Sequence, residues 1–370
     1  MNKKNVAQPK YQLVKDYVLS QIENNEMSQD DRIPSESEFA KLLDVSSITV
    51  RKALTDLVNE GVIYRVKGKG SFVAGMHAPA ADKSSNLIAF VISGIEMYDS
   101  SYMQIMKGVQ SFIAKHDFKL IIEFVENDVE EEHAAIMSLI ESEVRGILIY
   151  SSNPDSAKTY LDAIRRNAIP FVMMDRFPSG HPVNCISCNN HDGAYEAVEY
   201  LIQLGHRGIG FAALDFHLSP EVDRYNGYRN AMLGAKLPLS EENVYLDKTI
   251  DYAQLAARIN DGALTAIFCV NDRRAMEMVE NLIAQGIRIP EQVSVMGFDD
   301  FESAKYAKVA LSTVKQHFDV LGYESAKLLM EISSASTYGY KKILLPTSLV
   351  IRESTSAPGS SAQQASRSNA

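Results

Sequence analysis

The sequence predicts an α/β chain in two parts, an N-terminal winged helix-turn-helix and a larger two-lobed domain built on parallel β-sheets. Residues 8–75 hold three amphipathic helical stretches and a glycine-rich hairpin. Residues 87–353 alternate continuous apolar runs with amphipathic stretches, as in a parallel sheet covered on both faces. Residues 76–86 between them are rich in small polar residues without periodicity and read as a linker.

The composition is that of a globular protein with more than one domain. The 370 residues are 46% hydrophobic and 23% charged, enough apolar material for sizeable cores. No apolar run reaches the roughly 18 residues needed to span a bilayer, and no apolar run follows the charged N-terminus as in a secretory signal. Three cysteines are too few for a disulfide framework. We therefore expect a cytoplasmic protein without a membrane partner.

The charge is distributed unevenly along the chain. The formal net charge is −10, yet residues 1–75 carry 11 Lys and Arg against 10 Asp and Glu. A short part of this segment concentrates the basic residues Arg51, Lys52, Arg65, Lys67 and Lys69. A locally basic module on an acidic body is typical of a DNA binder whose larger part has another task. A surface of mixed charge is the alternative that charge alone leaves open.

The first two helices of the N-terminal module are predicted by spacing and capping. Val14, Val18 and Ile22 recur four residues apart and mark one helix face. Ser35 can cap the next helix, and Glu38 three residues later completes a capping box. We therefore expect a second, short helix after residue 35.

A third helix and a hairpin complete the module. Ser46 or Ser47 can cap this helix, and Gly61 can end it. Its apolar face comprises Val50, Ala53, Leu54, Leu57 and Val58. The strand-like runs 62–66 and 71–73 flank a glycine-rich tip, which predicts a β-hairpin. This order of elements predicts a winged helix-turn-helix.

Such a module reads double-stranded DNA with side chains near the start of the third helix, because the major groove admits one helix. Hydroxyls and helix starts can hold phosphates, and glycines at the wing tip let the backbone approach DNA while lysines supply charge. The predicted DNA-binding residues are Ser35, Glu36, Ser46, Ser47, Thr49, Arg51, Lys67, Gly68, Lys69 and Gly70.

Seven apolar runs predict the strands of the large domain, at residues 87–92, 119–124, 146–150, 170–174, 208–212, 266–270 and 293–297. Ligands of such sheets lie beyond the carboxyl ends of the strands. Polar and aromatic residues follow several of these runs, namely Tyr102, Arg176, Phe216, Asn271, Asp272 and Asp299. Carboxylates, guanidinium groups and rings suit a polyhydroxylated ligand, although strand ends are also where polar residues ordinarily occur.

The N-terminal module resembles the GntR-family DNA-binding domain over about residues 9–74. The resemblance rests on Pro34-Ser35-Glu36, Thr49-Val50-Arg51-Lys52-Ala53-Leu54 and Gly68-Lys69-Gly70-Ser71-Phe72-Val73. That family usually has Arg after the Val-Ser pair, where this chain has Ser47, so its base preference there does not carry over.

The large domain resembles the LacI-type effector domain over about residues 86–353. The motifs are Leu204-Gly205-His206-Arg207, Arg224-Tyr225-Asn226-Gly227-Tyr228 and Val295-Met296-Gly297-Phe298-Asp299-Asp300, with Asn271-Asp272. The resemblance implies that Arg224 and Asp272 contact sugar hydroxyls and that Arg176, Asp299 and Tyr102 occupy pocket positions. A GntR-type head on a LacI-type body is similar to the arabinose repressor family, which implies arabinose or a related sugar as effector.

We therefore expect a transcription repressor of carbohydrate-utilisation genes, a homodimer on a two-fold operator, without catalytic residues or cofactor. A transport-type sugar-binding protein, a regulator sensing a non-sugar ligand and an enzyme fused to a DNA-binding head are the alternatives. Cys185 and Cys188 form a Cys-x-x-Cys, but a second pair is missing and their odd spacing on a strand points them to opposite faces. No metal site is expected.

Overall fold

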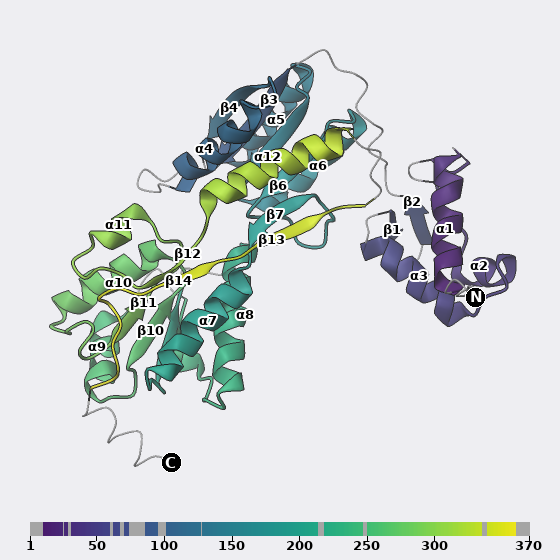
Figure 1. The fold of residues 1–370 in the computed structure, drawn as a ribbon. Coiled ribbons are helices and arrows are strands. Elements are labelled where there is room, and N and C mark those ends of the chain that lie inside the picture. The colour runs from purple at the N-terminus through teal and green to yellow at the C-terminus, as the bar shows by residue number, and fades with distance from the viewer. Residues whose placement is uncertain are drawn as a thin grey trace, which may run out of the picture.

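The computed structural model describes residues 10–24, 26–28, 31–59, 62–66, 70–73, 86–94, 101–126, 128–213, 218–246, 250–334 and 339–359. These residues form a small α/β head and a larger α/β domain of two lobes (Figure 1). The predicted linker, residues 76–86, lies outside the described residues except for Asn86. None of the described helices is both long and apolar enough to cross a membrane.

The head has the predicted winged helix-turn-helix order. Its elements are α1 (Lys10–Glu23), α2 (Glu36–Leu42), α3 (Ser47–Asn59) and the antiparallel strands β1 (Ile63–Val66) and β2 (Gly70–Val73). The predicted capping box at Ser35 and Glu38 is present at the start of α2. The predicted apolar faces of α1 and α3 meet in one core, which includes Val14, Val18, Ile22, Phe39, Val50, Ala53, Leu54 and Leu57.

A short segment before α2 extends the hairpin. The amide of Ile33 donates to the carbonyl of Ser71 at 3.0 Å, and the amide of Val73 donates to Asp31 at 2.9 Å. Gly70 opens β2 with φ +122°, and a Cβ there would lie 3.1 Å from Nε of Arg32. Gly70 therefore lets the wing turn while Arg32 crosses over it.

The first lobe is a six-stranded parallel sheet in the order β13-β7-β6-β5-β3-β4. Its strands are β3 (Leu87–Ser93), β4 (Lys119–Val125), β5 (Gly146–Tyr150), β6 (Phe171–Met174), β7 (Cys185–Cys188) and β13 (Lys342–Leu345). The covering helices are α4 (Ser101–Ile113), α5 (Val129–Glu141), α6 (Lys158–Arg166) and α12 (Phe318–Ser334), with a 3-10 turn η1 at Pro154–Ala157. One apolar core includes α4 and α12, and a second includes α5 and α6.

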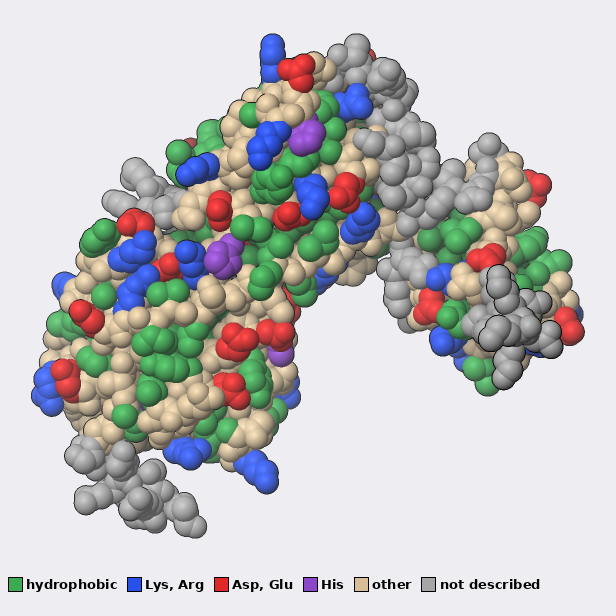
Figure 2. Space-filling model, viewed as in Figure 1, with side chains coloured by type: hydrophobic (Ala, Val, Ile, Leu, Met, Phe, Trp, Pro, Cys, Tyr) green, Lys and Arg blue, Asp and Glu red, His purple; other side chains and the backbone are tan. Residues whose placement is uncertain are grey.

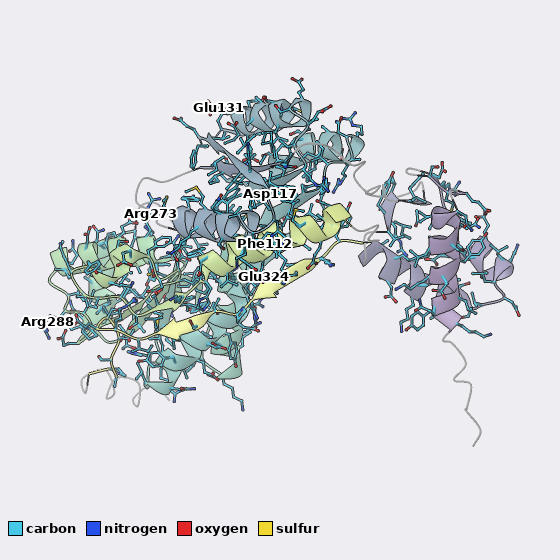
Figure 3. All side chains as sticks on the ribbon, turned by 45° about the horizontal axis from the view of Figure 1, so that its top comes forward. Phe112, Asp117, Glu131, Arg273, Arg288 and Glu324 are labelled. Carbon is cyan, nitrogen blue, oxygen red and sulfur yellow. The ribbon has the colours of Figure 1, made fainter. Side chains whose placement is uncertain are left out.

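Helices α4 and α12 cross closely because each has a glycine at the contact. A Cβ at Gly108 would lie 2.0 Å from the carbonyl oxygen of Asp319, and one at Gly322 would lie 2.1 Å from that of Ile105. The rings of Phe112 and Tyr323 meet edge to face at 5.2 Å, and Figure 3 labels Phe112 at this crossing. The crossing fixes α12, a late segment of the chain, on the first lobe.

The second lobe has a four-stranded parallel sheet in the order β11-β10-β8-β9 and an antiparallel pair, β12 with β14. The strands are β8 (Ile209–Ala212), β9 (Val244–Tyr245), β10 (Ala266–Cys269), β11 (Ser294–Met296), β12 (Thr313–Lys315) and β14 (Ser348–Val350). The helices are α7 (Asn190–Gln203), α8 (Ser219–Gly234), α9 (Tyr252–Asn260), α10 (Asp272–Ala284) and α11 (Glu302–Lys305), with a 3-10 turn η2 at Glu241–Asn243. One core includes residues of α7 and α8, and the other includes residues of α9 and α10.

The chain crosses between the lobes three times. It leaves the first lobe after β7, returns after β12 and crosses again after β13 (Figure 1). These crossings follow the carboxyl ends of strands. Residues just beyond β6 and β7 of the first lobe, and beyond β11 and β12 of the second, therefore lie at the ends of the lobes where the chain crosses between them. This arrangement positions the candidate ligand site.

The predicted disordered tail, 354–370, begins too early. Ser354 is fully buried, and its Oγ donates to the carbonyl of Val295 at 2.6 Å and accepts from the amide of Ser312 at 2.8 Å. Nε2 of His206 donates to the carbonyl of Ser356 at 2.9 Å. The segment that begins at Ser354 has no apolar run from which a buried segment could be predicted. The hydroxyl of Ser354 nevertheless satisfies buried backbone groups of the second lobe. Residues 360–370 lie outside the described part of the chain.

Candidate functional site

The start of α3 presents the predicted reading residues to solvent. Oγ of Ser46 accepts from the amide of Thr49 at 3.2 Å and lies 2.8 Å from its Oγ1, so Ser46 caps the helix. Ser47 and Arg51 are exposed, whereas Val50 beside them is fully buried. The core therefore fixes the rotation of α3 and turns its polar side outward.

Glu36 joins three elements of the head. Its carboxylate accepts from Nη2 of Arg51 at 3.0 Å and from Nε of the same side chain at 3.1 Å. Nη2 of Arg65, on β1, lies 4.0 Å from the other oxygen. Glu36 and Arg51 were both predicted to bind DNA, but the bond between them was not predicted. The pairing directs Nε and Nη2 of Arg51 toward Glu36, on a side chain that is 66% exposed, and arginine is the side chain that pairs bidentately with guanine.

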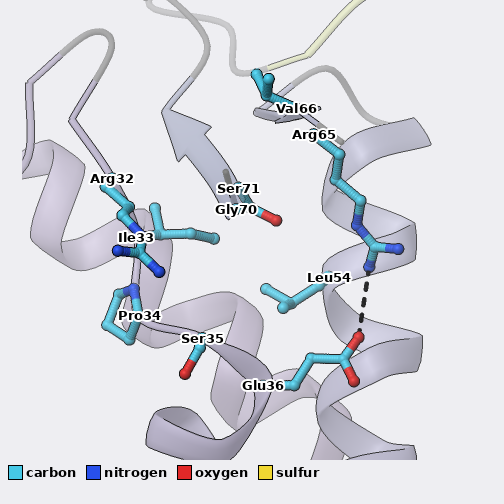
Figure 4. Close-up of a pocket in the computed structure, with 10 residues that line it drawn as sticks. All are labelled: Arg32, Ile33, Pro34, Ser35, Glu36, Leu54, Arg65, Val66, Gly70 and Ser71. Atoms are coloured by element: carbon cyan, nitrogen blue, oxygen red, sulfur yellow. Dashed lines mark ion pairs between the residues drawn. The ribbon is translucent and has the colours of Figure 1, made fainter. Parts of the chain in front are cut away.

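A cavity of about 330 Å³ lies between the wing and the start of α2. Figure 4 shows Arg32 and Arg65 on opposite sides of it, with the ion pair from Arg65 to Glu36 drawn. The predicted residues Ser35, Glu36 and Gly70 line it. The predicted wing residues Lys67, Gly68 and Lys69 lie outside the described residues.

In the large domain, Arg224 is the centre of a buried polar cluster. Its side chain, on α8, is 6% exposed. Nε donates to Oδ1 of Asn190 and Nη1 to the carbonyl of Val270, both at 2.8 Å. Nη2 lies 3.2 Å from Oδ1 of Asp299, and the guanidinium lies 3.9 Å from the ring centroid of Phe298. Groups from the ends of β7, β10 and β11 are thereby brought to one point.

Asp272 lies in this cluster with no exposed surface. Its carboxylate accepts from Oγ1 of Thr313 at 2.5 Å and from the amide of Phe301 at 2.8 Å. Burial raises the pKa of Asp272 well above its usual value, and the charge of Asp299 raises it further, against these hydrogen bonds. Asn271 caps α10 by accepting from the amide of Arg274 at 2.9 Å.

The backbone is strained at the acidic residues of both lobes. Asp299 has φ +123° and Asp300 +59°, and Asp175, after β6 in the first lobe, has φ +62°. Such conformations cost about 1–3 kcal/mol each and collect at binding and catalytic sites. Nε2 of Gln316 donates to Oδ1 of Asp299 at 2.6 Å.

Tyr102 and Arg176 form a second group, in the first lobe. The ring of Tyr102, 4% exposed, meets that of Tyr150 at 5.4 Å, and its hydroxyl donates to the carbonyl of Gly94. The guanidinium of Arg176 lies 4.7 Å from the same Tyr150 ring, and its Nη1 donates to the carbonyl of Ser151. Tyr150 therefore joins these two predicted residues. Phe216 lies outside the described residues.

Sequence reasoning missed Asn190, Thr313 and Gln316, whose side chains hold Arg224, Asp272 and Asp299. Asn190 lies just after β7 and Gln316 just after β12, whereas Thr313 begins β12, a strand that the apolar runs did not reveal. The position after a strand was the available signal, and it was applied only to the strands that the apolar runs revealed.

The cysteine prediction is confirmed in its geometry. Cys185 belongs to one apolar core of the first lobe and Cys188 to the other, so they face opposite sides of the sheet. Burial raises the pKa of both thiols. Among the described residues, no group of three or more His, Cys, Asp or Glu could hold a metal ion.

Acidic and basic side chains are interspersed over the visible face of both lobes (Figure 2).

The chain matches two known domain families. Residues 10–73 match the bacterial regulatory proteins of the gntR family, and residues 198–355 match the periplasmic binding protein-like domain. An arabinose metabolism transcriptional repressor of Geobacillus stearothermophilus is 28% identical over 94% of this chain and 98% of its own length. The transcriptional repressor PurR of Vibrio parahaemolyticus is 30% identical over 68% of this chain and 76% of its own length.

Solved structures share the fold. A complex of the transcriptional regulator CelR with cellobiose has a TM-score of 0.66 at 24% identity, covering 94% of this chain and 100% of that chain. A LacI family regulator of Enterococcus faecium with bound ribose has a TM-score of 0.62 at 23% identity, covering 73% and 99%. This chain belongs to the bacterial transcription repressors with a periplasmic binding protein-like domain, and its DNA-binding head is of the gntR family.

Proposed function

We propose that this repressor controls carbohydrate-utilisation genes and that a small sugar, arabinose or a related one, regulates its binding to operator DNA. The observation that carries the proposal is the buried cluster around Arg224, where a guanidinium, the carboxylates of Asp272 and Asp299 and the ring of Phe298 meet. Paired charged groups and a ring suit adjacent hydroxyls and C–H faces. The names of the arabinose repressors similar along nearly the whole chain support the choice of sugar.

Tyr102 and Arg176 would contribute from the first lobe, with Asn271 and Phe216 at the ends of second-lobe strands. Because Arg224 already bonds to Asn190 at the chain crossing, a ligand here would contact groups that hold both lobes. A sugar that binds better to one lobe arrangement would shift the population of that arrangement and so the position of the heads.

The head would bind double-stranded operator DNA through Ser35, Glu36, Ser46, Ser47, Thr49, Arg51, Gly70 and the wing residues 67–69. Exposure of the start of α3 and the aligned Arg51 guanidinium support this assignment. A homodimer would match a two-fold operator. Self-association is supported by β4, which is an edge strand of the first-lobe sheet among the described strands and exposes 57% of Phe124.

The head (8–75) and the sensing domain (87–353, with the following residues that pack on its second lobe) would be separate folding units in the cytoplasm, joined by the linker 76–86. Their apolar cores support this division, since no described core cluster contains residues of both parts. Limited proteolysis should cut in the linker and release two folded pieces. A regulator without catalysis should leave a bound sugar chemically unchanged, which chromatography of the recovered sugar would test.

Calorimetric titration of the full chain with a panel of pentoses and hexoses tests the effector. We expect one sugar to bind and to change the affinity for operator DNA in a mobility-shift assay. Arg224→Met should abolish the heat, and circular dichroism at the assay temperature checks that the large domain of the variant is still folded. Sugar binding without any effect on DNA would favour a transport-type role, and DNA binding that no sugar alters would favour a non-sugar effector.

A further inference from the structure

Ile48 is the most exposed aliphatic residue among the described residues of the head. Its exposed fraction is 79%, although it lies in the first turn of α3, one residue after the helix begins at Ser47. Branched aliphatic side chains are ordinarily buried, and α3 has an apolar face that Ile48 does not join. A singly exposed aliphatic residue is common on protein surfaces, so it is the place of Ile48 at the start of the proposed reading helix that points to a partner.

The surroundings of Ile48 are polar and already bonded. Arg51 and Lys52 lie three and four residues after Ile48, and Thr55 lies seven after it, so these exposed residues share the outer side of α3. Arg51 bonds to Glu36, and Nζ of Lys52 lies 4.6 Å from the ring centroid of Tyr11. Ile48 is thus a single hydrocarbon on a face of hydroxyl and basic groups.

From this position we propose that Ile48 reads a thymine, by contacting its 5-methyl group in the major groove. The proposal rests on the proposed binding of the head to operator DNA. In the major groove, thymine alone among the four bases presents a methyl group, and apolar side chains recognise it. Arg51, aligned by Glu36, lies one turn further along the same face and would address a neighbouring base pair.

The contact also supplies what Ser47 lacks. Serine can donate to or accept from several bases, so by itself it selects weakly. The side chain of Ile48, next to it, excludes water from the base edge that it covers. Polar atoms on a base edge lose hydrogen bonds to water when they are covered, whereas the methyl group of thymine has none to lose. Ile48 would therefore select thymine at this position of the operator.

The test separates the methyl group from the rest of the base. The full chain first selects operators from random duplex DNA, and each thymine of the selected site is then replaced singly by uracil, which lacks only the methyl. We expect one uracil position in each half-site to weaken binding about fourfold, the value of one buried methyl group. Fluorescence anisotropy at fixed salt concentration measures the affinities.

Two variants assign that position to Ile48. In the proposed homodimer Ile48→Ala changes both half-sites, so on the thymine operator it should lose about as much affinity as uracil in both half-sites costs the parent chain. On that doubly substituted operator the variant should lose nothing more, so the two changes are not additive. Ile48→Val keeps a branched hydrocarbon and should keep the preference for thymine. Leu42→Ala is the matched control, since Leu42 is 55% exposed at the end of α2 and should leave the preference unchanged.

Two results would overturn the proposal. One is an operator in which no uracil position weakens binding, and the other is an Ile48→Ala variant that loses affinity equally on both operators, as it would if Ile48 contacted sugar, phosphate or another protein. A chain that retains no duplex from the random pool would instead overturn the proposed DNA binding and this inference with it.

Discussion

The guanidinium of Arg224 lies 3.2 Å from the carboxylate of Asp299, and the two side chains are only 6% and 7% exposed. Asp299 also accepts from Gln316, and Arg224 from α8 donates to Asn190 and to the carbonyl of Val270. The pair is therefore balanced by protein groups before any ligand arrives. The proposed sugar would add its hydroxyls to this network or replace part of it, so its binding would be coupled to the arrangement of the second lobe.

Removing the charge of Arg224 should destabilise the large domain. Arg224→Met keeps the length of the side chain but leaves Asp299 as a buried carboxylate without its cation, a change that costs about 3–5 kcal/mol of unfolding free energy. Urea unfolding followed by circular dichroism at neutral pH measures it. Lys327→Met, which breaks an exposed pair with Glu324, should leave the midpoint unchanged. Equal losses in both variants would contradict the role given to burial.

The buried carboxyl of Asp272 should make stability depend on pH. Burial and the charge of Asp299 raise its pKa in the folded state. A raised pKa means that its contribution to stability is fully present below the ordinary aspartate pKa and is lost as the pH rises through the folded value. Asp272→Asn can still accept from the amide of Phe301 and can donate to Thr313, so it should remove this loss.

The advantage of Asp272→Asn in thermal unfolding midpoint should therefore grow between pH 4 and pH 8. Asp162→Asn, at a carboxyl whose side chain is 74% exposed, is the control and should change the midpoint equally at each pH. An advantage of Asp272→Asn that shrinks as the pH rises would show that the hydrogen bonds to the carboxylate outweigh its burial.

The head was predictable because its signals are local. The cap at Ser35, the apolar faces of α1 and α3 and the hairpin each depend on residues close in sequence, and each was confirmed. The bond between Glu36 and Arg51 was not predictable, since these residues are 15 apart and meet only when α2 packs on α3. Pairing across helices depends on tertiary packing that no periodicity encodes.

The same limit applies to the large domain. Long apolar runs revealed seven strands, but β12, β13 and β14 have three or four residues each and obtain their partners from distant segments. The chain crosses between the lobes after β12 and β13. Gln316, which directly follows β12, was therefore not predicted as a site residue. Arg224 and Asp299 were predicted from resemblance and from strand position, whereas the bond between Arg224 and Asn190 could be seen only in the folded chain.

Ser354 should matter more than its composition suggests. Ser354→Ala leaves the buried amide of Ser312 and the carbonyl of Val295 without their hydroxyl partner, which costs about 1–3 kcal/mol. Chemical unfolding of the full chain gives the value. Ser348→Ala, at an exposed serine, should change nothing measurable. If Ser354→Ala unfolded like the parent chain, the segment after residue 353 would not be part of the second lobe as described.

Arg51 and Arg65 share the carboxylate of Glu36 but should affect DNA binding differently. Arg51 lies on α3 with its guanidinium aligned by two bonds, so Arg51→Lys keeps the charge and loses the fork that pairs with a guanine. We expect operator affinity to fall about 10- to 100-fold while binding to unrelated duplex persists.

Arg65 lies on β1 beside the cavity, where its charge suits a phosphate. Arg65→Ala should weaken both kinds of duplex alike and reduce the salt slope of binding by about one, whereas Arg65→Lys should retain that slope. Anisotropy titrations at several salt concentrations separate the two patterns. A uniform loss for Arg51→Lys would move that residue from base reading to backbone contact.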